Sequence, residues 1–196
     1  MIANIALHIT DYFIRKNIIC EEDKAIYQYG FEMGISQTIN IITTLTIGFI
    51  MRMPLESITF LLCFLTLRTY AGGYHASSNL KCYILSTLMT IIVLTASYFV
   101  NLYNLYHAAI ICGITGTGLL VLLAPVDDAN KVMDMVERVV FRKRAMRALF
   151  MWLVIVVILF FTPLNSLSVV LCLCFFSIGI MVFCGYWKNH FLNKQI

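Results

Sequence analysis

Long uninterrupted apolar runs constrain this chain more than any other feature of its sequence. Hydrophobic residues make up 61% of its 196 residues and charged residues 12%, whereas soluble domains average about 45–50% apolar and about 25% charged. Consecutive runs of this kind predict helices that cross a bilayer, because a lipid-embedded backbone must satisfy its own hydrogen bonds. We therefore expect an all-α membrane protein in which residues 1–196 form a single integral-membrane domain.

The apolar runs predict about six transmembrane helices. They lie at about residues 35–51, 54–67, 80–100, 103–123, 149–161 and 164–186. The second run opens at Pro54 and is a little shorter than the roughly 17 residues that a span needs. It is open whether this run tilts, thins the bilayer or re-enters the membrane.

Residues 1–30 are predicted to form an amphipathic cytoplasmic N-terminal region. Its apolar side chains recur at helical spacing among charged residues, at Ile2, Ile5, Ala6, Ile9 and Phe13. Such a pattern is typical of a helix that lies in the membrane interface. The acidic run 21–23 suits the N-terminus of the helix that follows.

Residues 68–82 form the most informative polar segment, Arg-Thr-Tyr-Ala-Gly-Gly-Tyr-His-Ala-Ser-Ser-Asn-Leu-Lys-Cys. Ionisable groups at a bilayer are energetically costly, so a cluster of them indicates a functional site. His75 and Cys82 together are the minimal apparatus of thiol nucleophilic catalysis, in which the imidazole deprotonates the thiol. We interpret residues 68–82 as a catalytic segment.

His75 and Cys82 cannot meet on one continuous helix. Seven residues at about 1.5 Å each separate them by about 10.5 Å, too far for a contact of roughly 2.6–3.2 Å between base and nucleophile. Gly72 and Gly73 allow the chain to turn and let backbone amides approach a ligand, which makes these amides candidate oxyanion donors. The same glycine pair is equally compatible with a plain interhelical turn.

Cys82 is expected in the first turn of the next helix. Ser77, Ser78 or Asn79 can cap that helix, and capping by Asn79 makes Cys82 its third residue, where unpaired amides and the helix dipole favour a thiolate. Two nearby cations add positive potential, Arg68 and Lys81. A lone Cys and a lone His near a helix end are more often structural, so the spacing leaves both roles open.

Other classes of site have little support in the sequence. The seven cysteines are odd in number, five lie in apolar runs, and no C-x-x-C or H-E-x-x-H motif occurs. We therefore predict no metal site and no cofactor. The cations do not form a groove with interleaved aromatic residues, so nucleic-acid binding is not expected.

The catalytic segment resembles the core motif of the accessory gene regulator B family, bacterial membrane endopeptidases that mature quorum-sensing peptides. The resemblance rests on Gly-Gly-x-His followed by a Cys seven positions after the His, preceded by Arg68. Residues 123–128, Leu-Ala-Pro-Val-Asp-Asp, resemble the family's second hallmark. Chain length and hydropathy also match, so the resemblance covers nearly the whole chain.

The resemblance implies a mechanism and assigns roles. Cys82 corresponds to the nucleophile, His75 to the base, and Arg68 and Gly73 to residues that the active enzyme needs. Such enzymes cut a small amphipathic propeptide, keep its upstream part as a thioester, and pass it to a cysteine within the peptide, which gives a thiolactone ring; a lactone is the alternative. A homodimer is also implied. A third catalytic member is open between Asn79 and Glu32.

Residues 125–147 are predicted to be a basic cytoplasmic loop. Its cations can serve topology and contact with anionic lipids, or they can bind an acidic propeptide tail. The candidates for tail binding are Lys131, Arg142, Lys143 and Arg144. A non-enzymatic peptide exporter or membrane scaffold is the alternative function, and it would leave His75 and Cys82 dispensable.

The distribution of Lys and Arg predicts the orientation. With six spans, 13 of the 14 Lys and Arg residues fall on one side, and only Arg52 falls on the other. Because cytoplasmic loops carry the excess of cations, we expect a multi-pass protein of the bacterial cytoplasmic membrane. Both termini and the catalytic segment then face the cytoplasm.

This orientation can be tested by thiol labelling in intact cells. In a background freed of exposed thiols, Asn130→Cys and Leu192→Cys should resist an impermeant maleimide added outside, because a cytoplasmic thiol is beyond its reach. Leu102→Cys should react, since it lies in a predicted external break. Labelling of Asn130→Cys from outside would invert the orientation.

Overall fold

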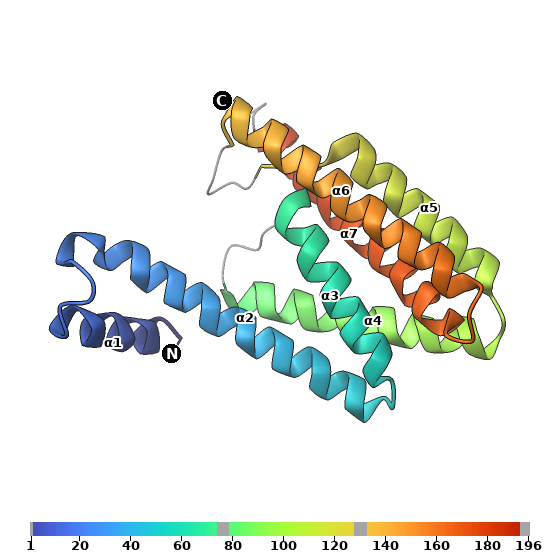
Figure 1. Ribbon diagram of the computed structural model, residues 1–196, viewed down its shortest axis with the longest axis horizontal. Coiled ribbons are helices and arrows are strands. Elements are labelled where there is room, and N and C mark those ends of the chain that lie inside the picture. Colours follow the sequence, from blue (N-terminus) through green and yellow to red (C-terminus); the bar gives the residue numbers. More distant parts are fainter. Residues whose placement is uncertain (1, 74–78, 128–132, 193–196) are drawn as a thin grey trace. The chain divides into compact units, whose positions relative to one another are not determined.

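The computed structural model describes residues 2–73, 79–127 and 133–192, with side chains as far as residue 190. Within these ranges the regular structure is helical, apart from one isolated bridge between Gly72 and Val126. The helices are α1 (Ile2–Arg15), α2 (Lys24–Ile50), α3 (Pro54–Ala71), α4 (Asn79–Leu102), α5 (Tyr106–Leu123), α6 (Met135–Phe160) and α7 (Asn165–Leu192), with a 3-10 turn at Glu21–Asp23 (Figure 1). The all-α prediction is confirmed.

Four helical segments of the described chain are long and apolar enough to cross a membrane. They are Glu21–Ile50, Asn79–Leu102, Tyr106–Leu123 and Asn165–His190. They match the first, third, fourth and sixth predicted spans and confirm the membrane class. The second and fifth predicted spans correspond to α3 and α6, which carry Glu56 and Arg68 and a basic N-terminal part.

The chain folds into two compact units, residues 1–44 and 45–196. In the first unit, α1 packs against the start of α2 through stacked rings of Phe13 and Phe31, whose centroids are 5.6 Å apart. The Nζ atom of Lys24 lies 2.7 Å from Oδ1 of Asp11, and this hydrogen bond holds the pKa of Asp11 below its usual value. The predicted N-terminal amphipathic helix is therefore present, and it forms a hairpin with α2.

The second unit is organised around α7, which packs against each of α3, α4, α5 and α6. Between residues 168 and 182 its side chains are buried or half-buried on all sides, as expected for an apolar helix at the centre of a bundle. The buried side chains include Val170, Leu171, Cys174, Phe175, Ile178 and Val182. A hydrogen bond links two of the helices that surround α7. The indole of Trp152 on α6 donates to the hydroxyl of Thr66 on α3 at 2.8 Å.

Helices α5 and α7 approach each other most closely at a glycine. A Cβ atom on Gly116 would lie 2.4 Å from the backbone carbon of Phe175, and one on Gly179 would lie 2.9 Å from the Gly116 carbonyl oxygen. Small residues allow such approach in membranes, where helices associate through close packing. This contact fixes the position of α7 against α5.

Two predicted boundaries are wrong. Helix α3 does not end near Leu67 but continues to Ala71, so Arg68 lies in its last turn instead of in a loop. The predicted basic loop 125–147 ends early, because α6 begins at Met135. A capping box starts α6: the Asp134 carboxylate accepts from the Met135 amide, and the Asp134 amide donates to Glu137. Most of the basic residues are therefore helical.

The packing of α5 on α7 predicts a difference between two glycines of one helix. Gly116→Ala should destabilise the protein by about 1–3 kcal/mol, because the new methyl group has no space and forces the helices apart. Gly118→Ala should be neutral or slightly stabilising, since nothing lies within 4 Å of its added Cβ and alanine favours helix. Thermal unfolding of both variants in one detergent measures the difference. Equal midpoints would contradict the close packing.

Candidate functional site

The glycine pair ends α3 and pairs with a distant segment of the chain. Gly72 and Gly73 have φ values of +67° and +110°, in the region that favours glycine. The Val126 amide donates to the Ala71 carbonyl at 3.0 Å, and the Gly73 amide donates to the Val126 carbonyl at 3.4 Å. The Arg68 guanidinium donates to the Gly72 carbonyl. The two stretches that resemble the family therefore meet in one place.

Neither glycine can carry a side chain here without a change in the backbone. A Cβ on Gly72 would lie 2.1 Å from the Val126 carbonyl oxygen. One on Gly73 would lie 3.0 Å from the carbonyl oxygen of Met181 and from Cα of Val182 on α7. The glycine pair is thus packed between Val126 on one side and the α7 backbone on the other. The Gly73 amide, a predicted oxyanion donor, already donates to Val126 through a long bond.

Polar contacts hold the other side of this pairing. Asp127 forms an ion pair with Arg138 in the first turn of α6. Its carbonyl accepts from the side-chain amide of Asn189 on α7 at 2.8 Å. These residues border a cavity of about 230 Å³, together with Tyr186 and His190, whose rings are stacked. Val126, which pairs with the glycines, also lines this cavity.

Cys82 lies in the first turn of α4 and is half-buried. Asn79 is already helical, so it does not cap the helix, and Cys82 is the fourth described residue of α4. The stabilisation of a Cys82 thiolate by the positive end of the helix dipole stays a prediction. The Cys82 carbonyl accepts from the hydroxyl of Ser86 at 2.9 Å.

Several predicted site residues cannot be placed beside Cys82. His75 and the alternative caps Ser77 and Ser78 lie outside the described residues, as does Lys131. Glu32 lies on α2 in the first compact unit. The Cys–His pair and its third member therefore stay predictions from the sequence.

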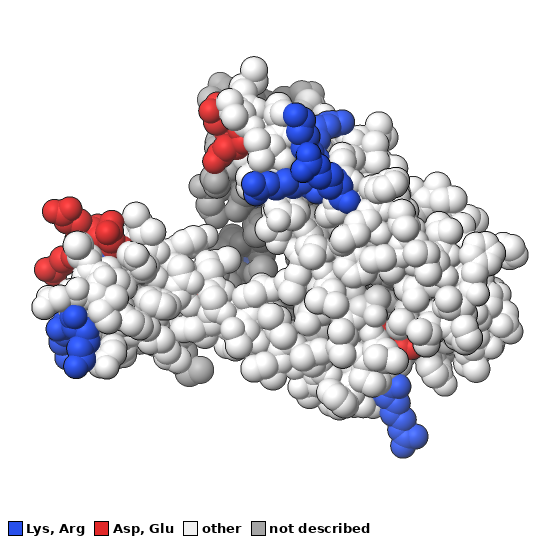
Figure 2. Space-filling model, viewed as in Figure 1, with Lys and Arg blue, Asp and Glu red and all other residues white. Residues whose placement is uncertain are grey.

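The basic residues of α6 contact the ends of other helices. Arg142 donates to the Val121 carbonyl in the last turn of α5 at 3.4 Å. The Arg144 guanidinium lies 6.0 Å from the ring centroid of Tyr70 on α3, and Phe141 packs edge-on against the same ring at 6.3 Å. Lys143 is exposed. Figure 2 shows a group of cations over the N-terminal half of α6, and the contact between Arg144 and Tyr70 brings this group to the end of α3.

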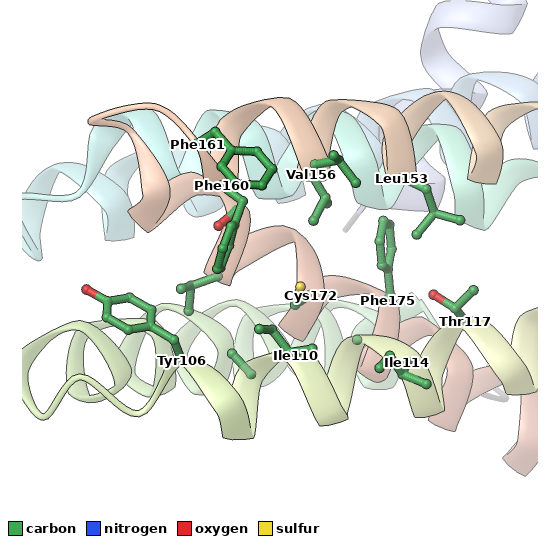
Figure 3. A pocket seen from close by; sticks show the side chains of 15 residues that line it. Tyr106, Ile110, Ile114, Thr117, Leu153, Val156, Phe160, Phe161, Cys172 and Phe175 are labelled. Atoms are coloured by element: carbon green, nitrogen blue, oxygen red, sulfur yellow. The ribbon is translucent and has the colours of Figure 1, made fainter.

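An apolar cavity in the second unit offers little chemistry. It has a volume of about 490 Å³ and lies between α5, α6 and α7. Figure 3 shows its wall of apolar side chains, with the hydroxyls of Tyr106 and Thr117 toward its two ends. No titratable base faces Cys172 among its lining residues. We therefore do not interpret this cavity as the catalytic site.

The structure adds three site residues that the sequence analysis did not single out. Val126 is hydrogen-bonded to the turn itself. Arg138 on α6 and Asn189 on α7 hold the adjacent residue 127. Val126 lay within a recognised stretch, but a pairing between distant segments leaves no local pattern. Asn189 follows a long apolar run and reads as a helix end. Only the Asp-x-x-Glu pattern at residues 134–137 could have indicated that Arg138 is helical.

Comparison with known proteins gives consistent matches. The sequence profile described as "Accessory gene regulator B" matches residues 6–184. AgrB-like protein 2 of Clostridium perfringens strain 13 is 31% identical over 136 residues, and an AgrB-like protein of strain SM101 is 30% identical over 136 residues. Each match covers 67% of this chain and 64% of the relative, so the chain spans less than two thirds of these relatives. No solved structure gives a significant match.

Proposed function

Because the chain belongs to the accessory gene regulator B family, we propose that it is a membrane cysteine endopeptidase that processes a small amphipathic quorum-sensing propeptide. Cys82 is the nucleophile and His75 the base. The observation that carries the proposal is the position of Cys82 at the N-terminus of α4, next in the chain to a turn that is fixed at Gly73. His75 follows that turn by two residues.

The position of Cys82 suits a thiol nucleophile. A thiolate gains stabilisation from unpaired amides and the positive end of the helix dipole. Cys63 and Cys174, in contrast, are fully buried in the apolar core. A thiol there has no access to a peptide and no charge partner. Among the described cysteines, Cys82 combines partial exposure with a helix N-terminus.

The reaction divides into two transfers of one acyl group. His75 takes the thiol proton, and the Cys82 sulfur attacks the carbonyl carbon of the scissile peptide bond. The C–N bond breaks, His75 returns the proton to the leaving amine, and the C-terminal tail departs. The upstream peptide stays on Cys82 as a thioester. An internal thiol of the peptide then attacks this thioester, which closes a thiolactone and restores the Cys82 thiol; an internal hydroxyl would give a lactone.

The basic residues near the end of α3 supply a place for the departing tail. Arg142, Lys143 and Arg144 form one exposed turn of α6, and an acidic tail would be attracted to it. Arg144 lies against Tyr70, two residues before the glycine turn. Tail binding there would place the scissile bond near the catalytic segment. We place the enzyme in the cytoplasmic membrane as a homodimer, with its active site on the cytoplasmic side.

The first test of this function is substitution of the dyad. Cys82→Ser and His75→Ala should each abolish propeptide cleavage, because the nucleophile or its base is lost, while the protein still inserts in the membrane. Cys63→Ser and Cys112→Ser should retain cleavage and serve as matched controls. Cleavage is measured by mass spectrometry of the released tail. Cleavage by Cys82→Ser at the wild-type rate would end the thiol-peptidase proposal.

The thioester intermediate gives a second prediction. Exchange between thioesters is nearly neutral in free energy, so ring closure needs the internal thiol held near the acyl carbon. A propeptide whose internal Cys is changed to Ala should still be cut, release its tail, and accumulate as an acyl adduct on Cys82. Intact-protein mass after acid quench would reveal the adduct. Tail release with linear product and no adduct at short times would argue for direct attack by water.

A further inference from the structure

The segment of residues 124–127 is tied to each of three helices by a different kind of contact. Its Val126 exchanges two backbone hydrogen bonds with the end of α3. Its Asp127 carboxylate pairs with Arg138 on α6. Its Asp127 carbonyl accepts from the Asn189 amide of α7. The chain immediately after α3 is therefore held by residues that lie far away in the sequence.

The ion pair is too exposed to serve mainly as a source of global stability. The side chains of Asp127 and Arg138 retain 22% and 53% of their exposed area, and ion pairs at such positions contribute little to folding. Their geometry is nevertheless specific. A side-chain amide directed at one backbone carbonyl and a guanidinium directed at one carboxylate fix the position of the same residue from two sides.

We propose that Asp127, Arg138 and Asn189 are positioning residues for the peptidase, an inference that rests on the function proposed above. They act through Val126, whose carbonyl receives the Gly73 amide. Gly73 has little room to compensate for a shift, because α7 backbone atoms come within 3.0 Å of the place where its Cβ would be. A displacement of residues 126 and 127 therefore displaces the point from which the catalytic segment leaves α3. Small misplacements of catalytic groups cost about a hundredfold in rate.

Removal of the α7 contact tests the proposal directly. In the full-length protein, Asn189→Ala should lower kcat for propeptide cleavage by about tenfold or more and leave KM within about twofold, because the substrate-contacting groups remain. Asn101→Ala is the matched control. It removes an amide-to-carbonyl hydrogen bond, to Ser97 at 2.9 Å, from the opposite end of α4, and it should keep the wild-type kcat.

The measurement must separate positioning from loss of folded protein. Rates are therefore expressed per folded protein, taken as the monodisperse fraction in size-exclusion chromatography in detergent. A purely structural role for Asn189 would reduce the folded fraction and leave the rate per folded protein unchanged. That result would overturn the proposal. A fall in kcat per folded protein would support it.

Charge exchange provides an independent test of the ion pair. Asp127→Arg and Arg138→Asp should each lower kcat, because each places like charges together. The double variant restores opposite charges. Its kcat should be at least about tenfold higher than that of the less active single variant. A double variant no better than that single variant would overturn the role of the pair. Recovery of kcat without a matching change in KM would support positioning.

The inference and the proposed function fail in different ways. If Cys82→Ser cleaves the propeptide normally, the thiol-peptidase function fails, whatever the Asn189 and charge-exchange variants do. If Cys82→Ser is inactive but Asn189→Ala has the kcat and KM of the wild type, the positioning role of Asn189 alone is wrong. The same enzyme preparation and propeptide serve both comparisons.

Discussion

The proposed site depends on the pair of backbone hydrogen bonds between Val126 and the end of α3. A helix that ends near a membrane leaves carbonyl groups without partners, and such groups are costly unless another element satisfies them. The Val126 amide provides one partner, and the Arg68 guanidinium provides another for Gly72. The end of α3 is therefore completed by a distant segment, and the chain after Gly73 begins from a fixed point.

Helix α7 makes this arrangement possible because its backbone lies close both to α5 and to the glycine turn. Its contact with α5 depends on Gly116 and Gly179, and its contact with the turn depends on Gly73. In lipid, burial of apolar area drives helix association weakly, so close packing and polar contacts carry more of the specificity. The backbone of α7 thus packs against α5 along one stretch and against the turn along another. Asn189 extends the same surface to Asp127.

Much of the fold could be predicted from the sequence because hydropathy is a local property. The long runs that became α2, α4, α5 and α7 are recognisable from their own residues. The start of α6 was missed because its cations mask the helix between Met135 and the apolar half, and the end of α3 was placed short because Arg68 reads as a boundary. The pairing of Gly72 with Val126 could not be predicted from local patterns, since neither segment carries a residue pattern that identifies the other. The resemblance alone marked both stretches.

The helix ends at the site share an electrostatic logic that the sequence could not reveal. Helices α3 and α5 end just before the two residues that form the bridge, Gly72 and Val126. The negative C-terminal ends receive cations, with Arg68 at Gly72 and Arg142 at Val121. These basic side chains thus complete the carbonyl ends of two helices, as cations near a helix C-terminus do. In the proposed function, the same cations give this part of the bundle a positive potential that suits an acidic propeptide tail.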